Sequence, residues 1–440
     1  MERELMSVKR INPRKWVLPA VAAAMGCADM ARAEYAVLDL GAMTSVGGVN
    51  ATGQVALTAP SGMTSHAFVY SGGTLLDLGT LGGTDSSSSA INGAGLVVGK
   101  STTAAGVTHP FVWTPGGTGG VASNPRMTDL NPNGAASEAS AINSTGQVVG
   151  YVSSGNGNGD SAVIYSNGGV TPIPLPAGGY TFSYAYGIND AGKVVGAGYI
   201  GQSSSAHGFC YDGTKSVAIG DLGGMNTSPS AINNNDRIVG YSTTAGGFDH
   251  AFVSVNGTMT DLGTLGAGHY SYANAINNIN QIVGGSFIDA ADATFHAFIS
   301  DGATMTDLNS LVTSKAASWV LSEANGINDN GVIVGTGTLS DQPHAFMLKP
   351  LLPGDANADL KVDFADLLTL AQHYNLTGAT WEQGDFNGDG TVGFADLLAL
   401  AQNYGRQSDP SPAFTAVPEP GASVSLVAAA RRRRRSASRS

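Results

Sequence analysis

Two acidic segments near the C-terminus place oxygen donors at alternating positions. Each begins with an aspartate that follows a glycine and ends in another aspartate, over residues 355–366 and 385–396. Loops of this kind surround a hard divalent cation with carboxylate, amide and backbone oxygens, and their negative charge offsets the dehydration of the ion. The predicted ligands are Asp355, Asn357, Asp359, the backbone carbonyl of Lys361, Asp363 and Asp366 in the first loop, and Asp385, Asn387, Asp389, the backbone carbonyl of Thr391 and Asp396 in the second. We therefore predict two Ca²⁺ ions, one in each loop.

The two loops depart from the ideal pattern at different positions. The sharp bend is formed by Gly390 in the second loop, whereas the first loop has Leu360 there. The first loop supplies Asp363 near its end, whereas the second has Gly393, so that a water molecule has to replace the side chain.

An amphipathic helix is predicted directly after each loop. The apolar stripes expected to be buried are Leu367, Leu370, Ala371 and Tyr374 in the first helix and Leu397, Leu400, Ala401 and Tyr404 in the second. Because helices of about three turns are marginal alone, we expect the two stripes to pack together. Without metal the clustered carboxylates repel one another, and the region should loosen or unfold.

The segment 354–405 resembles a dockerin type I domain. The resemblance lies in the tandem loop–helix pair, the absence of an entering helix, and aspartate rather than glutamate as the last ligand. It implies docking onto a cohesin-like or other envelope protein, often in polysaccharide-degrading assemblies. In that family the two residues before the last ligand help to select the partner and are often small and polar. The corresponding partner-binding residues here are Phe364, Ala365, Phe394 and Ala395, and the duplication allows docking in two orientations.

A repeat occupies most of the remaining chain, over residues 34–350. Ile-Asn or Val-Asn dipeptides recur 42 to 51 residues apart, with asparagines at Asn50, Asn92, Asn143, Asn189, Asn233, Asn277 and Asn328. Each unit contains two hairpin signals, such as INDAGKVVG from Ile188 and HAFVSVNGTMTDLG from His250. Two hairpins give four strands, the content of one propeller blade. The predicted fold is therefore mainly β: a seven-bladed β-propeller followed by a small α-helical domain with tandem calcium loops.

The two ends of the repeat are out of phase by one strand. YAVLDLG (35–41) stands alone before the first unit, and the last unit ends at HAFML (344–348) with no Asp-Leu-Gly strand after it. The N-terminal strand can thus complete the last blade and remove the open edge. A β-solenoid that begins within a repeat gives the same count and is the alternative. The units resemble bacterial extracellular HAF repeats, named after His-Ala-Phe, and this resemblance implies export and a propeller-like shape without an established activity.

The repeated His and Asp residues are interpreted as structural, and we predict no catalytic residues. Groups found in nearly every unit lie around a ring, whereas catalysis needs different groups that converge on one point. Aromatic residues before some Ile-Asn strands break the repeat, and Tyr184, Tyr272 and Trp319 are the candidate ligand-binding residues. Their rings could stack on sugar faces, or they could fill space between loops.

The two ends of the chain carry export and sorting patterns. Residues 1–33 predict a signal peptide, with a basic start, the apolar run WVLPAVAAAMG and the cleavage motif ARA. A linker is predicted over 406–416, and VPEP followed by five arginines makes 417–440 similar to a PEP-CTERM sorting tail. Its apolar stretch, about 15 Å long as a helix, is too short for a hydrocarbon core of about 30 Å, so we predict no transmembrane span. A basic tail that nothing recognises is the alternative.

The net charge and the domain organisation limit the functions that we expect. The net charge is −12, and most Lys and Arg residues lie near the ends, so the body is strongly acidic and nucleic acid is not an expected partner. We predict an extracellular or cell-surface calcium-binding protein, in which the propeller is a recognition or scaffold surface and the C-terminal module docks onto a partner. The alternative is a dockerin-bearing enzyme that degrades polysaccharide, a glycoside hydrolase or lyase built on the propeller.

Overall fold

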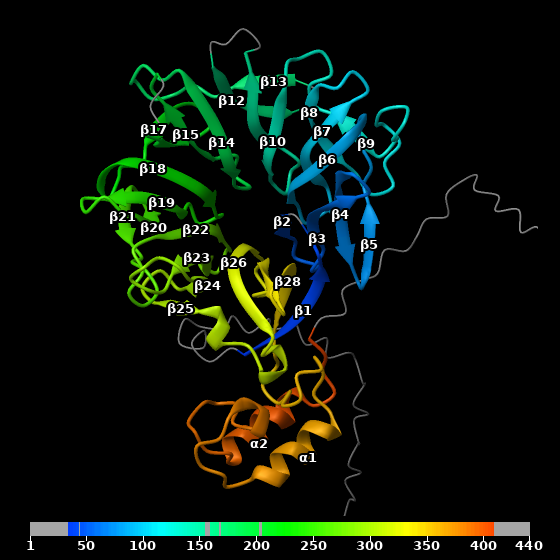
Figure 1. The fold of residues 1–440 in the computed structure, drawn as a ribbon, viewed down its shortest axis with the longest axis vertical. Helices are drawn as coiled ribbons and strands as arrows, with labels where there is room; N and C mark the ends of the chain where they lie inside the picture. The colour runs from blue at the N-terminus through cyan, green and yellow to red at the C-terminus, as the bar shows by residue number, and fades with distance from the viewer. Residues whose placement is uncertain (1–33, 44, 155–158, 167–168, 202–204, 409–440) are drawn as a thin grey trace, which may run out of the picture.

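The computed structural model describes residues 34–43, 45–154, 159–166, 169–201 and 205–408 (Figure 1). The predicted signal peptide, the sorting tail and residues 409–416 of the predicted linker lie outside the described residues. In the part of the chain that is described, no helix is both long and apolar enough to cross a membrane.

Seven four-stranded antiparallel sheets form the blades of a ring (Figure 1). Blades 1 to 3 consist of β2 (Ser45–Val49), β3 (Val55–Ser61), β4 (Thr64–Ser71), β5 (Thr74–Asp77), β6 (Gly82–Ile91), β7 (Val97–Thr103), β8 (Thr108–Trp113), β9 (Met127–Asp129), β10 (Ser137–Ile142), β11 (Val148–Ser153), β12 (Asp160–Ser166) and β13 (Gly169–Pro172). Blades 4 to 6 consist of β14 (Phe182–Ile188), β15 (Val194–Tyr199), β16 (His207–Tyr211), β17 (Ser216–Ala218), β18 (Gly223–Ile232), β19 (Ile238–Thr244), β20 (Asp249–Val255), β21 (Thr258–Asp261), β22 (Ser271–Ile276), β23 (Ile282–Phe287), β24 (Phe295–Ser300) and β25 (Met305–Asp307). The seven-bladed propeller predicted from the repeat is therefore confirmed.

Blade 7 is completed by the N-terminal strand. Its strands are β26 (Trp319–Ile327), β27 (Ile333–Leu339), β28 (Gln342–Pro350) and β1 (Tyr35–Gly41). β1 pairs antiparallel with β28, from Tyr35 opposite Pro350 to Gly41 opposite Ala345. Because β26 also contacts β2 of blade 1, the ring is closed, and the β-solenoid alternative is wrong.

A β-bulge in the inner strand of each blade explains the recurring glycine in VVG and IVG. In blade 2 the register shifts between Ser88 and Ala90, and Gly99 of the next strand faces the bulge. A Cβ on Gly99 would lie 1.9 Å from the carbonyl oxygen of Ser87, so a side chain there would collide with backbone. The equivalent glycines, which meet a carbonyl oxygen in the same way, are Gly150, Gly196, Gly240, Gly284 and Gly335.

The hydrophobic core lies between neighbouring blades. The alanines of the His-Ala-Phe segments, such as Ala251 and Ala345, are fully buried, and Phe252 and Phe346 fill the space between sheets. Burial of such groups stabilises the contact between blades by about 25 cal/mol for each Å² of apolar surface removed from water.

A closed ring of asparagine side chains joins all seven blades at the turn after each inner strand. Each Nδ2 donates to the backbone carbonyl of the equivalent asparagine in the next blade, and the last, Asn328, donates to Asn50 over 2.8 Å. The other donor–acceptor distances, taken in order around the ring, are 3.1, 3.1, 3.1, 3.1, 2.9 and 2.9 Å. All seven asparagines are buried, with 3–6 % of their surface exposed. The same side chain that ends one hairpin therefore holds the adjacent blade.

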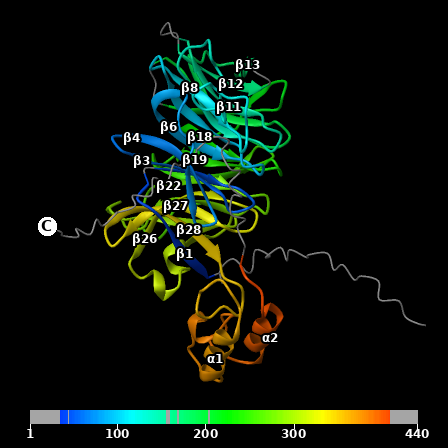
Figure 2. The same ribbon diagram turned by 90° about the vertical axis from the view of Figure 1, so that its right-hand side faces the viewer.

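The C-terminal module lies beside the ring, next to β1 (Figures 1 and 2). It contains α1 (Phe364–His373), the short 3₁₀ helix η4 (Trp381–Gln383) and α2 (Phe394–Asn403). Two further 3₁₀ helices, η2 (Leu308–Ser310) and η3 (Ser314–Ala316), connect blade 6 to blade 7.

Only part of each predicted apolar stripe is buried in the module. Leu370 and Leu400 are 2 % and 1 % exposed, and both belong to a core that includes Trp381. The prediction was wrong for the second half of each stripe, because Ala371 and Ala401 are exposed and Tyr374 and Tyr404 are 43 % and 51 % exposed. Each helix is short and packs on its calcium loop, so its last turn extends past the core.

Candidate metal centres and surrounding surfaces

Two loops with nearly the same backbone structure hold buried aspartates at their first and last positions. Asp355 and Asp366 are both 0 % exposed in the first loop, and Asp385 and Asp396 are 5 % and 0 % exposed in the second. Such burial of carboxylates is unusual unless a cation or hydrogen-bond donors compensate it.

Backbone amides hold these aspartates in place. In the first loop the Oδ2 of Asp355 accepts from Leu360 N over 2.9 Å, and the Oδ1 of Asp366 accepts from Ala356 N over 3.0 Å. In the second loop the equivalent distances are 2.8 Å, from Gly390 N to Asp385 and from Phe386 N to Asp396. The last aspartate of each loop therefore ties the start of the loop to the helix.

The helices begin at these loops because of their caps. The carboxylate of Asp363 accepts from Ala365 N over 2.8 Å, and Asp363 N donates back to Asp366 over 2.8 Å. This reciprocal capping box fixes the first turn of α1. In α2 the cap residue is Gly393, and only the return bond to Asp396 is made, over 2.8 Å.

The electrostatics of the first loop favour a cation. Burial, with a further contribution from the nearby Asp366, raises the pKa of Asp355 to about 6. Burial also raises the pKa of Asp366. None of the ion pairs formed by the described residues involves these aspartates. A divalent cation would supply the missing positive charge, so the donor set fits Ca²⁺.

Carboxylates alone do not complete either site. Among the residues that the structure describes, no three His, Cys, Asp or Glu side chains gather closely enough to hold an ion. The predicted ligand sets therefore depend on Asn357, Asn387 and the carbonyl oxygens of Lys361 and Thr391 as well. The amides of Asn357 and Asp359 donate to Asp366 and Asp355 over 3.2 Å each, so the first loop curls around its two buried aspartates.

Loop one adopts left-handed backbone at two residues that are not glycine. Ala358 and Leu360 have φ angles of 52° and 70°, and the equivalent Gly388 and Gly390 have 67° and 82°. A residue with a Cβ is strained in this region by about 1 kcal/mol or more. The departure at Leu360 was visible in the sequence, whereas the one at Ala358 was missed.

The first turns of the two helices expose a duplicated apolar face. Phe364 and Leu368 are 65 % and 48 % exposed, and Phe394 and Leu398 are 70 % and 47 % exposed. Ala365 and Ala395, the other predicted partner-binding residues, are exposed as well. Leu368 and Leu398 were missed, although their spacing of four residues from each phenylalanine places them on the same helix face.

The repeated His and Asp residues form pairs at the outer strands of the blades. A His Nδ1 lies 2.7–3.0 Å from a carboxylate oxygen in His66–Asp77, His109–Asp129, His250–Asp261, His296–Asp307 and His344–Asp39. Each aspartate also accepts from the backbone amide two residues later, which fixes the turn after the strand. The pair between His344 and Asp39 crosses the closure, so β1 reproduces the hydrogen bonds of an internal blade.

The three candidate ligand-binding aromatics lie in three different blades, and each packs against other residues. Tyr184 packs edge-on against Tyr151, with a 5.0 Å centroid distance, and its hydroxyl donates to Asp160 over 2.9 Å. Trp319 packs against His344 and the core between blades 6 and 7. Tyr272 lies 5.1 Å from Tyr241, ring centroid to ring centroid, and belongs to a larger cluster.

That larger cluster follows blades 5 and 6 to the surface. Its ring contacts, with centroid distances of 4.7–6.3 Å, join Tyr241, Tyr272, Phe295, Phe287, Tyr270, Phe248 and His269 in that order. At the exposed end Phe248 is 37 % exposed, and the side chain of His269, 39 % exposed, pairs with Asp292 over 3.0 Å. This His–Asp pair lies outside the repeat.

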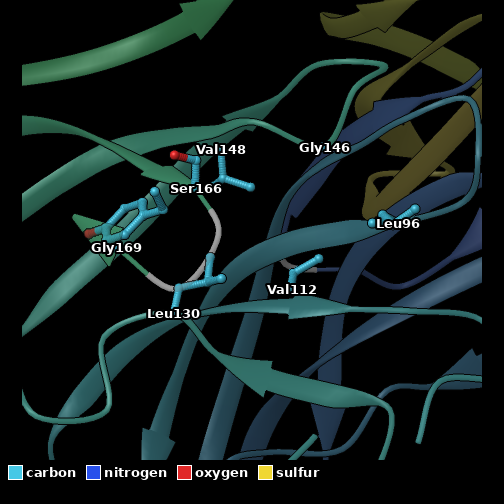
Figure 3. A pocket seen from close by; sticks show the side chains of 8 residues that line it. Leu96, Val112, Leu130, Gly146, Val148, Ser166 and Gly169 are labelled. Carbon is cyan, nitrogen blue, oxygen red and sulfur yellow. The ribbon is translucent and has the colours of Figure 1, made fainter. Parts of the chain in front are cut away.

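A cavity of about 170 Å³ separates blades 2 and 3 (Figure 3). Its lining is mostly apolar and includes Leu96, Val112, Leu130 and Val148. None of the predicted site residues lines it.

Comparison with known proteins finds a family model that matches one segment of the chain. Residues 353–412 match the family model of the dockerin type I domain. Type I dockerin domains bind calcium and dock onto cohesin partners, and proteins that carry them are typically extracellular or on the cell surface. No curated protein sequence matches the chain.

Similar solved structures share low sequence identity with the chain. The β-propeller domain of the trilobed protease from Pyrococcus furiosus is 12 % identical, with 58 % of this chain and 77 % of that chain covered and a TM-score of 0.40. A putative TolB from Agrobacterium tumefaciens is 14 % identical, with 56 % and 88 % covered and a TM-score of 0.34. At these values the similarities carry no argument about function.

Proposed function

We propose that this protein is an exported calcium-binding docking protein. Its propeller serves as a recognition or scaffold surface, and its C-terminal module attaches it to a cohesin-type or other envelope partner. The observation that carries the proposal is the duplication within a segment that matches the dockerin type I model: two loops with buried aspartates, each followed by a helix with an exposed Phe and Leu.

Each loop binds one Ca²⁺ ion through the ligands assigned above. The burial of Asp355 and Asp366 without a basic partner supports the assignment in loop one, and the matching hydrogen bonds of Asp385 and Asp396 support it in loop two. The bound ion would supply positive charge between carboxylates. The chain itself orients the oxygens through backbone amides and helix caps.

The docking faces centre on Phe364 with Leu368 and on Phe394 with Leu398. Large exposed apolar side chains at symmetry-related positions are typical of interaction surfaces. A phenylalanine here, where the family often has a small polar residue, requires an apolar hollow in the partner. Since the two faces have similar exposure, the partner can engage either of them.

Export and sorting complete the proposal. Residues 1–33 act as a signal peptide, the repeats are of the HAF type, and 417–440 act as a sorting tail. N-terminal sequencing of the protein from the culture medium or envelope should begin at Glu34.

A panel of immobilised cohesin modules and the secreted and envelope fractions of the host provide the test. We expect calcium-dependent capture of a cohesin module or a cohesin-bearing protein, lost with chelator and lost in the double variant Phe364→Ala/Phe394→Ala. Each single variant should retain capture, because the other face remains. Tyr374→Ala/Tyr404→Ala, on exposed residues outside the faces, is the matched control. Capture that survives both chelation and the double variant would contradict the proposal.

Glycan recognition by the propeller is a second candidate function. The aromatic cluster that reaches the surface at Phe248 favours it, because flat rings beside the His269–Asp292 pair offer both stacking and hydrogen bonds to a sugar. The original candidates Tyr184, Tyr272 and Trp319 remain proposals, with Tyr272 inside this cluster. Glycan-array binding that is lost in Phe248→Ala and unchanged in Trp319→Ala would assign the site to blades 5 and 6.

The alternative remains a polysaccharide-degrading enzyme, a glycoside hydrolase or lyase. His269 and Asp292 are the residues to test first, because they do not belong to the repeat. Release of sugar fragments by the full chain, abolished in His269→Ala, would support this alternative over a docking protein without activity.

A further inference from the structure

The calcium module begins almost directly at the last strand of the ring. β28 ends at Pro350, and the first calcium loop begins at Asp355. Between them Leu351 is 2 % exposed, and its amide donates to the carbonyl of Glu34 over 2.8 Å. From the other side, Asn403 of α2 donates through Nδ2 to the carbonyl of Pro353 over 2.8 Å. The connection is therefore fixed at both ends rather than a free linker.

The closing strand shares a hydrophobic core with the module. Ala36 of β1 is 7 % exposed and packs in one cluster with Leu370 and Leu400 of the two helices. Leu38 packs against this cluster and also against the core between blades 7 and 1. β1 is thus held by β28, by the neighbouring blades and by the calcium module (Figure 1).

Polar contacts also connect the first calcium loop to the region where β1 meets the module. Trp381 donates through Nε1 to the carbonyl of Asp355 over 2.8 Å. The next residue, Glu382, accepts from the amide of Ser314 in η3 over 2.6 Å. The segment before η3 borders β1, because Tyr35 N donates to the carbonyl of Leu311 over 2.8 Å. A continuous path therefore runs from Asp355 to the N-terminal end of β1.

We propose that the module is a calcium-dependent clamp on the closing strand, so that metal binding stabilises closure of the propeller. Without Ca²⁺, repulsion among the buried carboxylates loosens the first loop, and Trp381, Leu370 and Leu400 lose their fixed positions. Ala36 and Leu38 then become exposed, and β1 keeps only its contacts to the ring. An ion that binds the closed form more tightly than the open form shifts the equilibrium toward closure.

This inference rests on the calcium binding proposed above, and one experiment separates the two. Calcium binding to the full chain is measured by calorimetry, and amide hydrogen exchange is measured with calcium and with chelator. We expect calcium to slow exchange about tenfold or more in residues 35–41 and 342–350. Exchange in β11 and β12, in blade 3 and not in contact with the module, should be unchanged.

Two variants test the mechanism. Asp359→Asn neutralises an exposed predicted ligand and should remove most of the calcium-induced protection of β1. The control is Asp341→Asn, which neutralises an exposed aspartate in the turn between β27 and β28 and should retain the protection. Leu38→Ala should keep the heat of calcium binding and lose part of the protection. Heat of binding without slower exchange in β1 would overturn the clamp and leave the calcium site intact. Absence of heat would overturn both.

Discussion

Replacing Asn328 with alanine tests how the ring is closed. The side chain of Asn328 donates to the carbonyl of Asn50 over 2.8 Å and accepts from Val332 N over 3.0 Å. Its removal leaves the buried amide of Val332 without this acceptor and takes one of two donors from the buried carbonyl of Asn50, which still accepts from Gly53 N over 3.0 Å. The loss of a buried hydrogen-bond partner costs about 1–3 kcal/mol. We therefore expect Asn328→Ala to lower the free energy of unfolding by about 2–5 kcal/mol, with a value near the lower limit if water enters the space.

The matched control for this change is Asn330→Ala. Asn330 is exposed and donates to the carbonyl of Ala51 over 3.0 Å, also between blades 7 and 1. Because water can replace that contact, its loss should cost less than about 1 kcal/mol. Asn189→Ala removes the equivalent hydrogen bond between two internal blades. It should lower the free energy of unfolding as much as Asn328→Ala, because all neighbouring blades are joined alike in a closed ring. The assay is denaturant unfolding of the full chain in calcium. Equal stabilities of Asn328→Ala and Asn330→Ala would refute the reasoning.

Three further predictions concern the calcium module and the blades. Ala358→Gly relieves the strain of a left-handed backbone and should raise the stability of the calcium-bound module by about 0.5–1 kcal/mol, as measured by thermal unfolding. The reciprocal change, Gly388→Ala, should lower this stability by a similar amount. If both variants changed the stability in the same direction, the prediction would be contradicted. In the chelated protein the pKa of Asp355 is raised from the ordinary 3.8 to about 6, so the folded state binds this proton more tightly than the unfolded state does. The protonated carboxyl of Asp355 therefore stabilises the fold fully below about pH 4, and this stabilisation is lost as the pH rises through 6. The chelated protein should therefore have a higher Tm at about pH 5 than at about pH 7.5, and the Tm shift caused by calcium should be larger at the higher pH; a pH-independent shift would count against a metal site at Asp355. His344→Ala removes the pair with Asp39 across the closure and should lower the free energy of unfolding by about 0.5–1.5 kcal/mol. His250→Ala, in an internal blade, should cost the same amount. A much larger loss in only one of the two variants would show that the closing blade is held differently from an internal blade.

The sequence predicted the ring because its signals are local. Turn residues between short apolar strands define the hairpins. The lone strand at Tyr35 supplies the outer strand that the last unit lacks, and it pairs with β28. The ring of asparagine hydrogen bonds was not predicted, although the asparagines themselves were used for alignment. Each bond joins residues of different blades, at least 42 positions apart, and only the closed fold brings them together.

The C-terminal module shows a different limit. Helical periodicity identifies an apolar face, but α1 has two candidates, one with Leu367 and Leu370 and another with Phe364 and Leu368. Which face is buried depends on where the calcium loop and Trp381 pack, which periodicity cannot reveal. The predicted docking residues therefore lie on the exposed face, while half of the predicted stripe was assigned wrongly.

The aromatic cluster was not predicted from the sequence, although one of its members was. Tyr272 precedes an Ile-Asn dipeptide and breaks the repeat, so the sequence singled it out. Tyr270 and Phe287 both belong to blade 6, whereas Phe248 lies in a turn of blade 5. The contact between Phe248 and Tyr270 therefore arises only when blades 5 and 6 pack together.

Calorimetric titration of the full chain with calcium is the most direct test of the central claim. We predict binding of two ions, with one lost in Asp359→Asn and the other in Asp389→Asn, accompanied by a rise in Tm. A titration without heat, in a folded protein whose Tm is the same in calcium and in chelator, would contradict the account.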